Sequence, residues 1–239
     1  QYQFKDREDA SVTVPNIYSE TGESITIPLD QRLTLVENMQ ACYKKYDKLK
    51  RAQELLQVQR RECEANIAYL ESIEASLLAS SSLAEIAEIH NELIAAGYLR
   101  EKPKKKNNDK PARPFHFRAP DGTDILVGKN NYQNDKLTFK TARYNDTWFH
   151  TKDIPGSHVV LQNGGTEPSE EDILLAASLA AHFSKARGSS KIPVDYTEIR
   201  YVKKPSGSKP GFVIFTNQKT LYITPDEAKL APILAQDPS

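Results

Sequence analysis

The feature that most constrains the fold is a long stretch without glycine or proline, which runs from Thr34 to about Ser80. Thr34 and Glu37 have the spacing of a capping box, in which each side chain satisfies a backbone N–H of the first helical turn. Apolar residues then recur every three or four positions, beginning with Val36 and Met39. The stretch therefore predicts one helix, on the order of 70 Å long, with a coiled-coil-like apolar stripe whose phase slips once.

A second, shorter helix is predicted from Leu83 to about Ala96, where Gly97 ends it. This helix is too short to cover the whole apolar stripe of the first one. An amphipathic helix is not stable alone in water, so the rest of the stripe must meet a second copy of the chain or a segment that precedes Gln1. We expect self-association through four side chains of this helical arm, namely Tyr43, Tyr46, Leu49 and Leu56.

The chain of 239 residues is long enough for one or two domains. We divide it into an irregular or strand-like segment over 1–33, a coiled-coil arm over 34–99, a basic linker over 100–113 and a compact domain over 114–239. β-Branched alternation predicts a short strand at 24–29, and the opening dozen residues are expected to lack tertiary contacts. The predicted fold class is therefore α+β, with a long helical arm followed by a compact mixed head.

Charge is uneven along the chain, although the net charge is zero. Residues 1–99 carry 10 Lys and Arg against 16 Asp and Glu, whereas residues 100–113 carry 7 against 2. A nucleic-acid partner would therefore meet local basic patches and not a global field. The linker is either a solvated tether or a strap that contacts phosphates through Lys104, Lys105 and Lys106.

The head is predicted from alternating strand-like and helical patterns. The predicted strands are 115–118, 125–127, 147–151, 157–162, 194–202, 212–215 and 221–223. The predicted helices are 136–142, which follows a group of turn-forming residues at 130–135, and 173–186, which follows a capping box at Ser169 and is ended by Gly188.

Residues 128–160 contain the residues that could take part in catalysis or recognition, namely Asp146, Trp148, His150, Gly156, Ser157 and His158. Neighbouring residues of a strand face opposite sides, and no GxSxG elbow surrounds the serine, so the pattern disfavours a catalytic triad. The histidines also lack the spacing of metal ligands. Neither an enzyme nor a metal or cofactor site is predicted.

Two interpretations of this segment stay open. In the first, Trp148 packs in the core, while Asp146 and His150 hydrogen-bond the Pro155–Gly156 turn. In the second, the same aromatic and polar groups line a groove that faces RNA. We favour the first interpretation and expect Trp148 to be buried.

A basic loop between Lys203 and Gly211 is the most suggestive candidate for phosphate contacts. Lysines supply point charges, and the exposed N–H groups of a Gly-Ser backbone can cradle a phosphate. The loop lacks the Gly-Lys-Ser/Thr ending of a P-loop, so nucleotide hydrolysis is not expected; a plain solvated turn is the alternative. The candidate nucleic-acid-binding residues outside the linker are Lys129, Lys136, Arg143, Lys203, Lys204 and Lys209, and Lys140 and Arg187 could extend the same surface.

Several stretches of the chain resemble the NFACT family. ENMQACYKKYDKLK, EANIAYLESI and IHNELIAAGYL are similar to its coiled-coil region. GKNNYQNDKLTFKTARYNDTWFHTKDIPGSHVV, LAASLAAHFSKARGSSKIPVDYT and YVKKPSGSKPGFVIFTNQKTLYITP are similar to its RNA-binding domain. The resemblance covers about residues 24–225, and it implies that the chain is the C-terminal part of a longer protein.

The resemblance implies two functions. Members of the RqcH type act in ribosome quality control, so the large ribosomal subunit and tRNA are implied partners, and the full-length protein would add an alanine tail. Members of the FbpA and PavA type are named for binding fibronectin, which implies an adhesin displayed on the cell surface without a signal peptide or anchor. The sequence shows no apolar run long enough for a membrane span, so we expect a cytoplasmic protein that does not insert into membranes.

Overall fold

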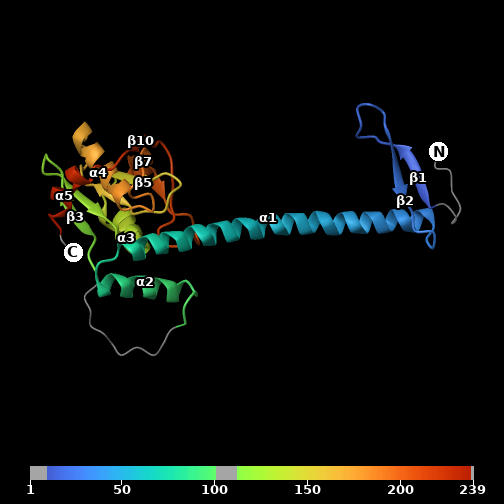
Figure 1. Cartoon of the computed structure of the whole chain (residues 1–239), viewed down its shortest axis with the longest axis horizontal. Coiled ribbons are helices and arrows are strands. Elements are labelled where there is room, and N and C mark those ends of the chain that lie inside the picture. The colour runs from blue at the N-terminus through green and yellow to red at the C-terminus, as the bar shows by residue number, and fades with distance from the viewer. Residues whose placement is uncertain (1–9, 101–111, 238–239) are drawn as a thin grey trace. The chain divides into compact units, whose positions relative to one another are not determined.

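The computed structural model describes residues 10–100 and 112–237, and the predicted linker residues Lys104, Lys105 and Lys106 lie outside them. By its contacts the chain forms two compact units, over 1–65 and 66–239, whose boundary falls within the longest helix. Each unit is described by itself (Figure 1).

The N-terminal unit contains an antiparallel hairpin of β1 (Ser11–Pro15) and β2 (Ser24–Pro28). β2 confirms the strand predicted at 24–29. The expectation that the opening dozen residues lack tertiary contacts is wrong at its last three positions, because Ala10 O accepts the Leu29 N–H, Ser11 pairs with Pro28 and Val12 pairs with Ile27. Half-buried valines alternate with exposed residues along β1. This alternation of period two extends over only one short strand, so the sequence analysis did not predict it.

α1 (Leu35–Ala79) confirms the predicted long helix. Its capping box forms as predicted: the Thr34 N–H donates to Glu37 Oε2 at 2.7 Å, and the Glu37 N–H donates to Thr34 Oγ1 at 3.3 Å. The apolar stripe is exposed on the N-terminal part of the helix, where the exposed fractions of Tyr43, Tyr46, Leu49 and Leu56 are 64%, 59%, 59% and 62%.

α2 (Leu83–Ala95) confirms the second helix, and Gly97 follows it with a φ of 81°. α2 packs on the C-terminal turns of α1, where Ile89 and Leu93 contact Tyr69 and Ile73. The small size of this cluster agrees with the prediction that α2 cannot cover the whole stripe.

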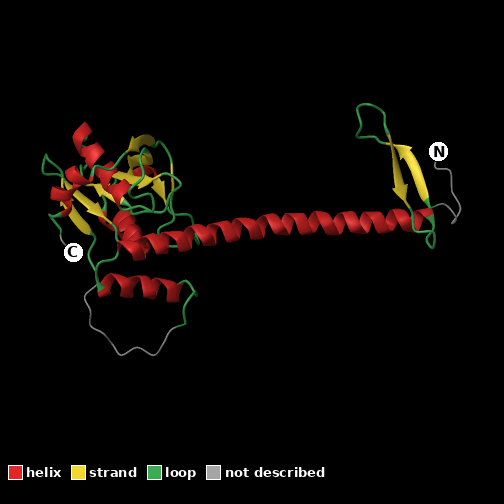
Figure 2. Cartoon of the chain, in the orientation of Figure 1, coloured by secondary structure: helices red, strands yellow, loops and turns green. Residues whose placement is uncertain are grey.

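The C-terminal unit is built on a six-stranded antiparallel sheet in the order β10-β7-β5-β6-β4-β3. Figure 2 shows the strands of this unit in yellow and its helices in red. Its strands are β3 (Phe115–Arg118), β4 (Asp124–Val127), β5 (Thr147–Thr151), β6 (Val159–Leu161), β7 (Ile192–Glu198) and β10 (Lys219–Ile223). Together with the helices described next, this sheet confirms the predicted α+β class.

One face of the sheet is covered by α4 (Glu170–His182) and α5 (Glu227–Leu234). Alanines of α4 and Leu230 of α5 are buried in one cluster with Phe149 and other strand residues. Small side chains on α4 let the helix lie close to the strands, and α5 contacts β3 (Figure 1). α5 was not predicted.

The opposite face is covered by α3 (Asn131–Lys136), by a π-helical turn (Leu137–Thr141) that continues it, and by the segment after β7. Successive strand residues point to opposite faces, so Trp148 packs here while Phe149 packs against α4. The remaining elements of this layer are a 3₁₀ turn (Ile199–Tyr201) and the two-stranded ladder of β8 (Val202–Lys203) and β9 (Ile214–Phe215).

Two predicted helix boundaries are wrong. The helix predicted at 136–142 begins earlier, because the Asn130 side chain accepts the Gln133 N–H and so caps α3; N-cap residues and turn-forming residues share this chemistry. The helix predicted to reach 186 ends at His182, because the next residues pair with the turn before β6. The Ser157 N–H donates to Phe183 O at 3.0 Å.

The strand predicted at 194–202 is also wrong in its second half. β7 ends at Glu198, and the chain then turns away from the sheet. The Ile199 N–H donates to Asp146 O at 2.9 Å, and the Arg200 N–H donates to Tyr144 O at 3.1 Å. These bonds replace ladder pairing and place the 3₁₀ turn beside the turn that precedes β5.

Candidate nucleic-acid interface

The aromatic signature of β5 is buried, as predicted. Trp148 is 0% exposed; its ring centroid lies 5.8 Å from that of His150, 5.1 Å from that of His158 and 5.0 Å from that of Phe215. His158 Nδ1 is 2.8 Å from Thr138 Oγ1 of the π-helical turn. Burial lowers the pKa of His150 and lowers that of His158 well below its ordinary value, so both imidazoles are neutral parts of a core.

The prediction that Asp146 holds the Pro155–Gly156 turn is wrong. For His150, burial lowers the pKa, and the nearby Gly156 backbone offsets part of this effect. Asp146 bonds elsewhere. Its carboxylate accepts the Arg143 N–H at 2.7 Å and the Gly164 N–H at 2.9 Å. Asp146 therefore fixes the turn before β5 against the loop after β6.

Gly156 is required by a close approach of two chain segments. A Cβ added there would lie 2.9 Å from Ser184 Cβ and 2.9 Å from Thr151 Oγ1. Within the described residues no group of three His, Cys, Asp or Glu is placed to hold a metal ion.

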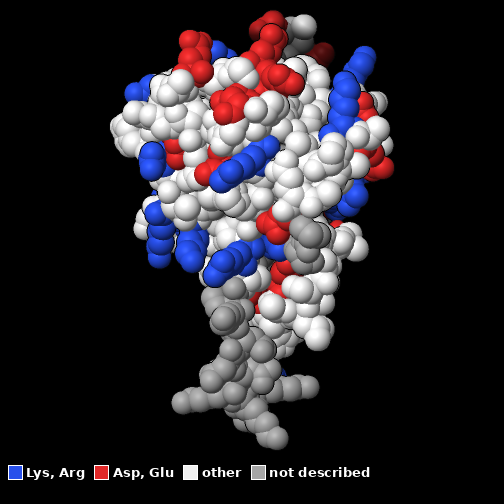
Figure 3. Space-filling model, turned by 90° about the vertical axis from the view of Figure 1, so that its left-hand side faces the viewer, with Lys and Arg blue, Asp and Glu red and all other residues white. Residues whose placement is uncertain are grey.

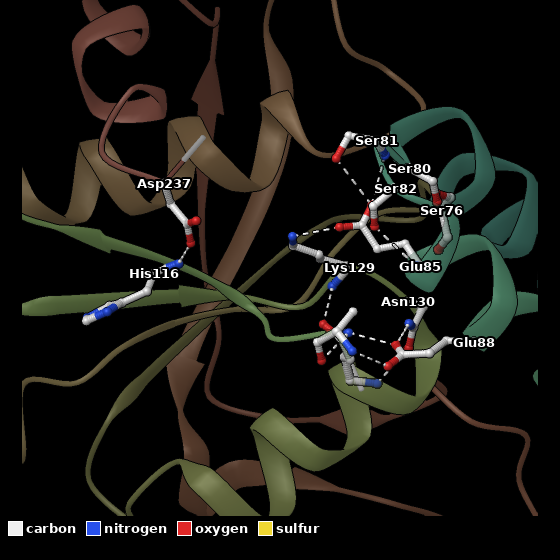
Figure 4. A network of polar contacts seen from close by, with 12 residues as sticks. Ser76, Ser80, Ser81, Ser82, Glu85, Glu88, His116, Lys129, Asn130 and Asp237 are labelled. Atoms are coloured by element: carbon white, nitrogen blue, oxygen red, sulfur yellow. Dashed lines mark hydrogen bonds and ion pairs between the residues drawn. The ribbon is translucent and has the colours of Figure 1, made fainter. Parts of the chain in front are cut away.

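Lys129 is not a free cation, so its assignment as a nucleic-acid-binding residue is wrong. Its Nζ lies 2.7 Å from Glu85 Oε1 of α2, with side-chain exposures of 9% and 3%, and 3.9 Å from the ring centroid of Phe115. Figure 4 shows Lys129 and Glu85 pointing toward each other, with Ser81 bonded to the same carboxylate. A buried lysine in such a pair cannot reach a phosphate without breaking the pair.

Two further acidic residues of α2 extend this junction to the head. Glu88 accepts the side-chain amides of Asn130 at 2.6 Å and Gln133 at 2.8 Å (Figure 4). Glu92 Oε1 accepts the Tyr69 hydroxyl at 2.9 Å and the Asn131 amide at 3.0 Å. Burial raises the pKa of Glu92. The segment 129–133 therefore serves as a docking site for α2, a role that no local sequence signal reveals.

The basic loop 203–211 also bonds to other segments of the same chain. Lys204 forms an ion pair with Asp135, whose other oxygen accepts the Gly211 N–H at 3.0 Å. Lys209 donates to Asn66 and to the Tyr98 hydroxyl, and its Nζ lies 4.4 Å and 4.9 Å from the ring centroids of Tyr69 and Tyr98.

Lys204 and Lys209, which were predicted to bind nucleic acid, thus have partners within the chain. Lys203 is exposed. Lys204 joins the loop to α3, and Lys209 joins it to α1 and to Tyr98, which follows α2.

Several exposed cations and aromatic residues lie on α3 and the turns beside it. Among the described residues, Lys136, Lys140, Arg143 and Lys203 are exposed and form no ion pair. We define the cation–aromatic surface by residues from α3, the π-helical turn, the turn before β5 and the segment after β7, namely Lys136, Phe139, Lys140, Arg143, Tyr144, Arg200 and Lys203.

The backbone bond from Arg200 to Tyr144 O joins the two ends of this surface, and the Asp135–Lys204 pair joins the loop to α3. The sequence analysis missed Phe139, Tyr144 and Arg200. The interleaving of cations and aromatics over 136–144 could have revealed Phe139 and Tyr144, whereas Arg200 is joined to this segment only by the fold. On the face drawn in Figure 3, basic and acidic side chains are interspersed, so positive charge is local.

Comparison with known proteins decides the family. Residues 1–112 match the NFACT N-terminal and middle domains, and residues 113–217 match the NFACT protein RNA binding domain. A solved structure, the C-terminal of the fibronectin/fibrinogen-binding protein from Streptococcus suis, superposes with a TM-score of 0.76 at 49% identity over 84% of this chain and 80% of that chain. This chain belongs to the NFACT family.

Curated NFACT relatives carry the name "Rqc2 homolog RqcH". The Bacillus subtilis protein is 46% identical over 221 residues, which are 91% of this chain and 38% of the relative. The Streptococcus suis protein is 48% identical over 224 residues, which are 93% of this chain and 40% of the relative. The chain thus spans about two fifths of the length of these relatives.

The NFACT RNA-binding match contains the whole cation–aromatic surface. No helix among the described residues combines the length and the apolar character needed to cross a bilayer.

Proposed function

We propose that the chain is the RNA- and ribosome-binding part of a ribosome quality control factor of the RqcH type. On this proposal the full-length protein binds a stalled large subunit with its peptidyl-tRNA and adds an alanine tail, and it works in the cytoplasm. Relatives named RqcH and the match to an RNA-binding domain support the proposal. We also propose that this part of the protein binds and does not catalyse.

The observation that carries the proposal is a group of exposed cations on the cation–aromatic surface that form no ion pair among the described residues: Lys136, Lys140, Arg143 and Lys203. An unpaired surface cation can replace a counterion at a phosphate, and each such contact steepens the dependence of affinity on salt. With about 0.7 for each contact to a single strand, four contacts correspond to a log–log slope of roughly −3.

The test is the affinity of the chain for purified large subunits and for tRNA over a range of salt concentrations. We expect a slope of roughly −3 to −4, and a flatter slope, by about 1 to 2, when Lys136 and Lys203 are both replaced by alanine.

The matched control replaces Lys152 and Lys229, two exposed lysines outside the surface, and should leave the slope near that of the parent. A parent slope near zero would contradict RNA binding through these cations.

A second candidate function is fibronectin binding by a protein displayed on the cell surface. It is supported by the likeness to the C-terminal of a fibronectin/fibrinogen-binding protein. We propose that both functions can reside in one chain. Affinity for immobilised fibronectin, measured beside that for large subunits, separates them: specific binding of fibronectin alone would favour the adhesin.

A further inference from the structure

We infer that the cation–aromatic surface binds unpaired nucleotides, with Tyr144 and Phe139 stacking on bases while the neighbouring cations contact the flanking phosphates. This inference rests on the proposed RNA-binding function and deepens it, since it names the form of RNA that the surface takes. It is carried by three observations: the exposure of the two rings, the rigidity of the backbone beneath them, and their place among unpaired cations.

The two rings are available to a ligand. Tyr144 is 69% exposed and Phe139 is 38% exposed. Neither ring stacks on another aromatic ring among the described residues, whereas the buried Trp148 contacts three. A single exposed aromatic residue is ordinary in a folded protein. Here two exposed rings are interleaved along 136–144 with exposed cations that form no ion pair among the described residues, and interleaved rings and cations are the pattern of a single-strand binding surface.

The backbone beneath the rings is fixed from the inside. In the π-helical turn, Leu137 and Thr138 are 1% and 0% exposed, and Thr138 is hydrogen-bonded to His158 in the core. The Ala142 N–H closes the turn on Leu137 O at 2.9 Å. Because the first two residues of the turn are held inward, the next two, Phe139 and Lys140, are presented to solvent.

Tyr144 is fixed from both sides of its own turn. The preceding Arg143 N–H is held by the buried carboxylate of Asp146, and Tyr144 O accepts the Arg200 N–H. A surface whose backbone is already ordered loses little entropy when a ligand binds. π-Helical turns in α-helices are frequent at functional sites, and this one separates the anchored core from the exposed rings.

The chemistry of the surface favours unpaired nucleotides over a duplex. In a duplex the base faces are stacked on one another, and its shape is recognised mainly through phosphates and 2′-hydroxyls. Cations alone would be sufficient to bind the phosphates of a duplex. Exposed rings gain binding energy only from base faces that are free, as in loops, bulges and ends. Stacking tolerates any base, so the surface should show little sequence preference.

The experiment compares three RNA probes by fluorescence anisotropy with the whole chain. The probes are an adenine-rich single strand of about 12 nucleotides, a length within the usual range of site sizes, the same strand with abasic central positions, and a blunt duplex of equal length. The variants are Tyr144→Ala, the conservative Tyr144→Phe, and the control Tyr222→Ala, whose tyrosine on β10 is 73% exposed.

We expect the parent to bind the intact single strand more tightly than the abasic strand or the duplex. Tyr144→Ala should weaken binding of the intact strand by about 5- to 150-fold, with little effect on the abasic strand. Tyr144→Phe and Tyr222→Ala should bind like the parent. Unchanged Trp148 fluorescence would show that the head of each variant is folded.

Equal binding of the intact and abasic strands, or parent-like binding by Tyr144→Ala, would overturn the inference. If affinity still fell steeply with salt in that case, the proposed RNA-binding function would stand without it. A parent that bound none of the three probes would overturn both.

Discussion

The ion pair between Lys129 and Glu85 should contribute to stability and not to RNA binding. The two side chains are 9% and 3% exposed, and their charged atoms are 2.7 Å apart. Replacing Lys129 by methionine removes one charge and leaves the other buried. Removing one partner of a buried pair costs about 3–5 kcal/mol in the free energy of unfolding, which is a large fraction of the total for an ordinary domain.

The double variant Lys129→Met with Glu85→Gln should be less destabilised than the sum of the two single variants. It has no unpaired buried charge, and replacing a whole buried pair is often nearly neutral. The coupling energy between the two sites should be about 0.5–3 kcal/mol. Lys203→Met is the matched control, because Lys203 is exposed and forms no ion pair among the described residues; it should stay within about 0.5 kcal/mol of the parent.

The assay is urea unfolding followed by tryptophan fluorescence. Trp148 is the only tryptophan of the chain and is fully buried, so its emission reports the unfolding of the head. Lys129→Met should unfold at lower urea than Lys203→Met. A midpoint for Lys129→Met equal to that of the control would refute the reasoning, as would a loss of RNA affinity without a loss of stability.

The same pair predicts a pH dependence. Burial alone raises the pKa of Glu85, but hydrogen bonds from Lys129 and from the backbones of Ser81 and Ser82 outweigh it, so the pKa lies below its ordinary value. Glu85 therefore contributes stability that is present above its unfolded pKa, about 4.3, and is lost as the pH falls through the folded pKa. The cost of Lys129→Met should shrink in acid, where Glu85 becomes neutral.

Three further predictions concern other parts of the molecule. Trp148→Ala should lower stability by about 3–5 kcal/mol, measured by thermal melts in circular dichroism; a parent-like melt with lost RNA binding would show that the core role is wrong. Glu92, whose pKa burial raises, contributes stability in acid that is lost as the pH rises through its folded pKa, so the melting temperature of Glu92→Gln relative to the parent should increase from about pH 4 to about pH 8. Replacing Leu49 and Leu56 by lysine should convert any self-associated species into monomer in sedimentation experiments, because both are exposed on the apolar stripe; a parent that is monomeric at high concentration would argue against self-association.

Local signals in the chain predicted most of the secondary structure. The capping boxes at Thr34 and Ser169 form as expected, since their partners are three residues away. α1, α2, β3 and β5 follow from periodicity, glycine placement and β-propensity. Burial of Trp148 was the favoured one of two interpretations of the sequence, and the structure confirms it.

Tertiary contacts decided which charged side chains are paired within the chain and which are exposed without a partner among the described residues. Glu85 and Lys129 are 44 residues apart in the chain, and Lys209 is 111 residues from Tyr98. No window of sequence contains both partners, so a lysine that is neutralised in a junction and one that is free on the surface look alike. Ile199 and Arg200 were wrongly predicted to continue the strand for the same reason, since their hydrogen-bond partners lie in the turn before β5. An ion pair or a backbone bond depends on distance in space, and only the fold sets that distance.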